Sequence, residues 1–86
     1  MDINELISIV KEKLESQILI QNIKIEDKSF LHKGHKTNEV NKFHLKITLT
    51  SSELVKLNKI DSNRKIYKIL EKELEKSIHS LQILIN

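Results

Sequence analysis

The chain has 86 residues, 38% of them hydrophobic, which allows one domain with a modest aliphatic core. The absence of cysteine excludes a disulfide framework and any thiolate ligand from the chain itself, so we expect a reducing compartment, the cytoplasm. The formal net charge of +3 arises from lysines interspersed with acidic residues, which favours a solvated surface over a dedicated nucleic-acid patch.

The first half of the chain predicts a helix, a strand and a long loop. Apolar residues recur at helical spacing from Ile3 to Leu14, after Asp2 and Glu5, which have the spacing of a capping box. Residues 18–26 are rich in β-branched side chains and predict a strand. The polar segment between residues 27 and 42 predicts a long connecting loop. No apolar run approaches the roughly 20 residues of a membrane span, and we expect no membrane association.

The second half predicts a strand, two helices and a final strand. Apolar and polar residues alternate strictly from Phe43 to Thr50, which indicates a strand with one buried face. Serines 51 and 52 can cap a short helix that ends near residue 57, and Asp61 or Ser62 can cap a longer helix that continues to about residue 78. After His79 the apolar residues alternate again, which predicts a third strand over residues 81–85.

This order of elements predicts a single domain over residues 1–86 with a two-layer α+β fold, α-β-β-α-α-β. The first two strands can pair as an antiparallel hairpin, whereas the third returns through a helix, so the three-stranded sheet should be mixed, with helices on one face. The apolar face of the second strand should be buried beneath the long helix. The residues expected to meet there are Leu45, Ile47 and Leu49 of the strand and Ile66, Leu70 and Leu74 of the helix.

The four histidines are the candidates for metal chemistry, since neutral imidazole is the commonest metal ligand in proteins. The spacing of His32 and His35 would suit zinc, but a third and a fourth ligand are not apparent. His44 opens a strand on its polar face, and we interpret it as a structural residue that bonds to the backbone beside the loop. Without further information His79 would be a surface residue that caps the last helix.

Four segments, taken together and in order, resemble the BolA family. They are residues 27–35, the alternating strand that His44 opens and Ser51 ends, Arg64-Lys65-Ile66-Tyr67, and Ile78-His79-Ser80-Leu81. The resemblance covers nearly all of the chain and implies a fold similar to the class II KH fold. It implies an adaptor that forms a heterodimer with a monothiol glutaredoxin and shares a [2Fe-2S] cluster with it, with a role in iron-sulfur cluster trafficking or iron sensing.

The resemblance also implies which residues bind the cluster. The glutaredoxin and a bound glutathione provide thiolates, and the BolA-like chain provides a C-terminal histidine, here His79, and a loop residue, here His32 with His35 as the alternative. This division of ligands is chemically reasonable, because a chain without cysteine cannot hold such a cluster alone but can supply two imidazoles to one iron. We therefore expect no cofactor in the isolated chain, which should be a monomer or at most a weak homodimer.

The rival hypothesis is a transcriptional regulator that binds DNA. The two predicted helices around residues 58–61 resemble a helix-turn-helix, in which Asn63 and Arg64 would read base edges while Lys65 and Lys68 hold phosphates. Glu71 and the acidic residues after it argue against this arrangement. An enzyme is not expected, because no nucleophile and base pair, phosphate loop or carboxylate pair is evident.

Overall fold

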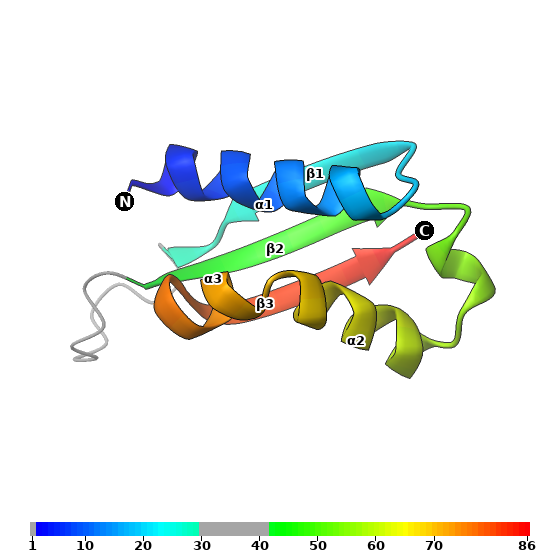
Figure 1. Cartoon of the computed structure of the whole chain (residues 1–86). Coiled ribbons are helices and arrows are strands. Elements are labelled where there is room, and N and C mark those ends of the chain that lie inside the picture. The colour runs from blue at the N-terminus through cyan, green and yellow to red at the C-terminus, as the bar shows by residue number, and fades with distance from the viewer. Residues whose placement is uncertain (1, 30–41) are drawn as a thin grey trace.

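The computed structural model describes residues 2–29 and 42–86, which form a three-stranded sheet with helices on one face (Figure 1). The central strand pairs antiparallel with the first strand and parallel with the third, so the predicted mixed sheet and two-layer α+β fold are confirmed. In chain order the elements are α1 (Ile3–Gln17), β1 (Asn22–Asp27), β2 (Phe43–Thr50), the 3-10 turn η2 (Leu54–Lys56), α2 (Lys59–Ile69), α3 (Glu71–Lys76) and β3 (Ile78–Ile85). Within the two described segments no helix has the length and apolar character needed to cross a bilayer.

The central strand β2 has the bounds that its alternating pattern predicts. Its inward side chains, Leu45, Ile47 and Leu49, are between 0% and 2% exposed. The outward residues between them are half-buried at most, as expected for a strand with one face toward helices. The remaining core residues come from α1, η2, α2 with its C-cap, and β3, and they include Leu6, Val10, Leu14, Leu54, Ile66, Leu70 and Ile78. Leu74, which was expected among them, is only partly buried.

The predicted start of the first strand is wrong, because residue 18 is the C-cap of α1. The amide of Ile18 donates to the carbonyl oxygen of Leu14 at 2.9 Å and closes the helix. Ile18 is buried, as its apolar side chain suggests, but Leu19 beside it is 61% exposed. The first residues of the β-branched run therefore connect α1 to β1, and β1 begins only at Asn22.

The predicted long helix differs from the structure at both ends. It begins at Lys59, because Asn58 rather than Asp61 or Ser62 is its N-cap, with the side-chain oxygen accepting from the amide of Asp61 at 2.8 Å. The helix is interrupted at Leu70, where φ is −96° and ψ is 17°, and α3 follows. The chain is already extended at Ile78, so β3 begins before His79 and not after it. The predicted short helix before α2 is a single 3-10 turn.

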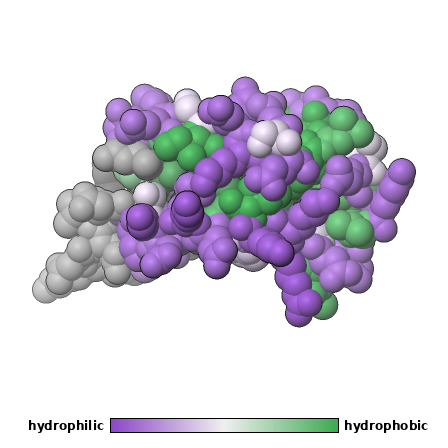
Figure 2. All heavy atoms as spheres, in the orientation of Figure 1, coloured by the Kyte–Doolittle hydropathy of each residue, from purple (hydrophilic) through white to green (hydrophobic). Residues whose placement is uncertain are grey.

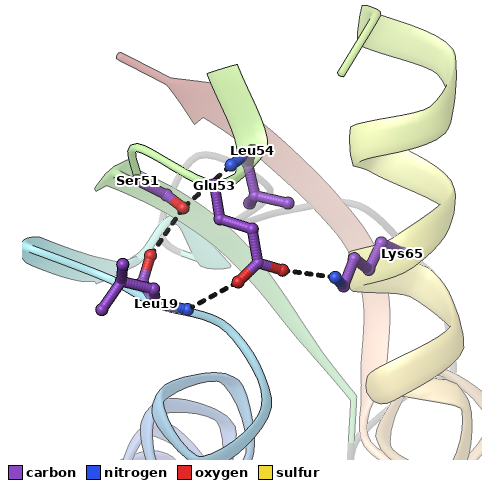
Figure 3. Close-up of polar contacts among 5 residues, drawn as sticks. All are labelled: Leu19, Ser51, Glu53, Leu54 and Lys65. Carbon is purple, nitrogen blue, oxygen red and sulfur yellow. Dashed lines mark hydrogen bonds and ion pairs between the residues drawn. The ribbon is translucent and has the colours of Figure 1, made fainter. Parts of the chain in front are cut away.

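A polar cluster ties the α1–β1 connection to the chain after β2 and to α2 (Figure 3). The hydroxyl of Ser51, which is fully buried, donates to the carbonyl oxygen of Leu19 at 2.7 Å and accepts from the amide of Leu54 at 3.1 Å. The carboxylate of Glu53 accepts from the amide of Leu19 at 3.2 Å, and its other oxygen pairs with the ammonium of Lys65. These bonds satisfy backbone groups that neither a helix nor the sheet satisfies at this end of the molecule.

The central position of Ile47 predicts a large loss of stability when its side chain is shortened. Ile47→Ala should lower the free energy of unfolding by roughly 2 to 5 kcal/mol, because it leaves a cavity in the core. Ile47→Val, which removes one methylene group, should cost about 0.5 to 1.5 kcal/mol and guards against a failure of the alanine variant to fold. Ile60→Ala is the control, since Ile60 is 65% exposed. Urea denaturation measures all three, and equal losses at positions 47 and 60 would contradict the layer assignment.

The contacts of Glu53 predict a specific acid sensitivity. The hydrogen bond from Lys65, followed by that from the Leu19 amide, holds the pKa of Glu53 below its ordinary value of 4.5. A carboxyl group with a lowered pKa stabilises the fold fully above its unfolded pKa, and this contribution disappears as the pH falls through the folded pKa. Glu53→Gln should therefore reduce the free energy of unfolding at neutral pH, and the difference from the parent should shrink below about pH 4.5.

Urea denaturation over a series of pH values tests this prediction. Glu12→Gln removes an exposed carboxylate from α1 and is the matched control. A difference between the parent and Glu53→Gln that stays constant with pH would show that the charge of Glu53 does not contribute.

Candidate functional site

His79 lies at a β-bulge near the start of β3. Phe43 of β2 is opposite Ile78, and His44 is opposite Ser80, so one step along β2 matches two steps along β3. A regular strand would direct Ile78 and Leu81 to opposite faces, because they are three residues apart. The bulge allows both of them to pack on the core. His79 and Ser80, between them, are exposed.

The bulge brings His79 into contact with His44. The two ring centroids are 4.9 Å apart and the ring planes meet at 68°, an edge-to-face arrangement. Nδ1 of His44 lies 2.6 Å from the hydroxyl oxygen of Ser80, which follows His79 in the chain. The ring of the half-buried His44 is thus held by β3 and in turn limits the orientations open to the exposed ring of His79.

The last described residues before the segment that carries the other two histidines are bonded beside this pair. The amide of His44 donates to the hydroxyl oxygen of Ser29 at 3.1 Å, and the amide of Lys28 donates to the carbonyl oxygen of His44 at 2.7 Å. Ser29 is the last described residue before the segment that carries His32 and His35, and these two predicted ligands lie outside the described residues. Figure 1 shows that the end of α3 and the start of β3 lie at the same end of the sheet as the end of β1, which leads to Ser29.

The described donors do not complete a metal site by themselves. Over residues 2–29 and 42–86 no group of three or more histidine, cysteine, aspartate or glutamate side chains could hold an ion. The two imidazoles that lie side by side offer nitrogen donors of the kind that iron, zinc and copper bind. The arrangement can therefore contribute part of a coordination sphere that other donors complete.

The sequence pattern favours a structural role for His44 and does not reveal its contact with His79. A signal was present in Ile78 and Leu81, because two core residues three positions apart in a strand indicate a bulge, and a bulge redirects a side chain. The partner of the bulge could not be found without the strand register, which places His44 opposite Ser80.

The residues proposed to bind DNA do not form a helix-turn-helix. The expected first helix is η2, with only three residues, whereas the motif requires two helices. On α2, Lys65 is paired with Glu53, and Asn63 is half-buried. Arg64 and Lys68 are exposed one turn apart and remain available on the surface.

Comparison with known proteins places these features in a family. The family model described as BolA-like protein matches residues 14–86. The chain is 28% identical over 75 residues to the DNA-binding transcriptional regulator BolA of Haemophilus influenzae, covering 87% of this chain and 70% of that protein. It is 29% identical over 77 residues to Protein BOLA1, chloroplastic, of Arabidopsis thaliana, covering 86% of this chain and 48% of that protein, about half its length.

The fold agrees with the same assignment. The solved structure of the BolA domain of SufE1 from Arabidopsis thaliana superposes with a TM-score of 0.77 at 26% identity, over 92% of this chain and 87% of that chain. The match of the family model over most of the sequence and the agreement in fold lead to one conclusion: the chain belongs to the BolA-like protein family.

Proposed function

We propose that the chain is an adaptor that pairs with a monothiol glutaredoxin and shares a [2Fe-2S] cluster with it, in iron-sulfur cluster trafficking or iron sensing. The observation that carries this proposal is the exposed ring of His79, on a bulge and edge-on to His44. The second histidine beside it limits the orientations of the exposed ring, which favours a role as a metal ligand.

The donor set of the chain fits a shared cluster. The chain contains no cysteine, so the thiolates that such clusters require must come from the glutaredoxin and glutathione. The cluster, when bound, is the cargo or the sensed group and supplies one-electron redox chemistry. His79 contributes a neutral nitrogen ligand to the cluster, and His44 holds the ring of His79 in place. The second ligand from this chain is His32 or His35, on the segment that begins after Ser29, which is bonded to His44.

The position of His79 explains why it should be the principal ligand. Its neighbour Ile78 is buried in the core, and Leu81 packs against the core. The backbone on both sides of His79 is therefore anchored, while the imidazole stays exposed. A ligand on a rigid strand is preorganised and loses less freedom when it binds than a ligand on a long loop, which the sequence predicts for His32 and His35. We therefore propose that His79 contributes more to binding than His32 or His35.

Mixing experiments with a monothiol glutaredoxin test this function. The chain, glutaredoxin, iron, sulfide and glutathione together should give cluster absorption and visible circular dichroism that the chain alone does not give. His79→Ala should cause the largest loss, and His32→Ala should cause a smaller loss if His35 can replace it. His44→Ala should weaken cluster binding roughly 10- to 100-fold, as expected for a residue that orients a ligand.

Two controls separate binding from folding. His79→Ala should leave the free energy of unfolding unchanged within about 0.5 kcal/mol, because the side chain is exposed. Gln82→Ala changes another exposed residue of β3 and should leave the spectra unchanged. Unchanged cluster spectra in the triple alanine variant of His32, His35 and His79 would refute the shared-cluster mechanism.

DNA binding is the second candidate, favoured by the name of the Haemophilus influenzae relative and by the exposed Arg64 and Lys68. Two cations on one face of α2 can neutralise phosphates but offer little base readout. We expect weak binding of duplex DNA that falls steeply with salt in fluorescence anisotropy. Arg64→Ala should weaken it equally for all sequences. Nanomolar binding to one duplex at physiological salt, lost in Arg64→Ala, would instead establish the regulator.

A further inference from the structure

The strand β3 forms an edge of the sheet, and the usual edge protection is missing from its C-terminal half. Among the described residues the strand order is β1-β2-β3, so nothing pairs with the far side of β3 (Figure 1). Residues 77–86 contain no charged residue and no proline. Natural edge strands are commonly guarded by charges, proline or bulges, because an open edge is a template for another strand. The bulge at His79 protects only the start of β3.

The hydrogen bonds of β3 show which backbone groups face the open edge. The amide of Asn86 donates to the carbonyl oxygen of Leu49. Because the direction of the backbone groups alternates along a parallel ladder, the amides and carbonyls of Leu84 and Gln82 also point toward β2. Leu81, Ile83 and Ile85 then direct their amides and carbonyls away from the sheet. The Tyr67 hydroxyl reaches the carbonyl oxygen of Leu81 at 3.4 Å, which agrees with this direction and covers the edge at that point.

Beyond Tyr67 the edge opens into a groove whose lining is part apolar and part polar, the polar part coming from Lys59, Ser62 and Asn63. A groove of about 400 Å³ runs between residues 83–85 of β3 and the chain that contains η2 and the start of α2. Val55 and Leu57 in its wall are 54% and 40% exposed, and Leu84 is 49% exposed on the outer face of the sheet. Figure 2 shows apolar side chains that reach the surface at this end of the molecule.

We propose that this edge is where a second copy of the chain binds, by antiparallel pairing of β3 with β3 centred on Leu84. In this register Ile83 of each copy lies opposite Ile85 of the other, and their outward amides and carbonyls can form four hydrogen bonds. Leu84 then lies opposite Leu84 on the outer face, where cross-strand pairs are in contact. The isoleucine side chains of each copy turn toward the groove of the other.

A second copy fits this edge better than an unrelated partner because the edge is self-complementary. The free amides and carbonyls of residues 83 and 85 are symmetric about Leu84, the exposed leucine of β3. A two-fold axis at Leu84 places residues 82–86 opposite the same uncharged residues of the other copy, so no charged side chains meet along the paired strands. His79 is six residues from Ile85, roughly 20 Å along the strand, so this proposal does not depend on the proposed function.

A charge-swap experiment tests the interface. Sedimentation of the parent should show an average mass that rises with concentration from one 10.1 kDa chain toward two. Leu84→Lys should raise the dissociation constant by roughly tenfold or more, because it places like charges opposite each other. An equimolar mixture of Leu84→Lys and Leu84→Glu should restore association. Thr50→Lys adds the same charge to an exposed site on β2 and should leave association unchanged.

Hydrogen exchange gives an independent, residue-specific measurement. The amides of Ile83 and Ile85 should become protected as the concentration rises, whereas that of Leu84, already directed to β2, should not change. A chain that stays monomeric up to millimolar concentration would overturn the proposal. Association that survives Leu84→Lys would overturn it as well, because the interface would then lie elsewhere.

Discussion

The one-sided burial of β2 is the constraint on which the other elements depend. Leu45, Ile47 and Leu49 have almost no exposed surface, and they can reach that state only if strands flank β2 and helices cover its inner face. Hydrophobic burial is the main favourable term in folding, and a domain of this size has little of it to lose. The antiparallel pairing with β1 and the parallel pairing with β3 cover the two edges of β2.

The demand for burial also creates the candidate site. Ile78 and Leu81 both pack on the core, and a strand can satisfy both positions only with an extra residue between them. The bulge exposes His79 and turns it toward His44, which is held by Ser80 and Ser29. The same strand is therefore irregular and histidine-bearing at its start and regular, uncharged and open at its end. We propose a different contact for each end, one with a cluster-bearing partner and one with a second copy.

Prediction from the sequence succeeded where the local pattern and the tertiary environment agree. Strand β2 has strict alternation, and both of its ends were found. The first strand was extended too far, because the apolar side chain of Ile18 serves the core equally well from the end of a helix. Asn58 was missed as a cap, since several residues between 58 and 62 could cap a helix and only the path of the chain after η2 selects among them.

The sequence by itself determined the fold class, the order of the elements and the identity of His79 as the principal candidate, because these depend on periodicity and on an ordered set of segments. The tertiary structure alone decided that His44 lies against His79, that Lys65 is engaged by Glu53, and that the backbone of Ile83 faces outward. The physical reason is common to all three. Each depends on strand register or on packing between segments distant in the chain, and neither is encoded in the periodicity of any single segment.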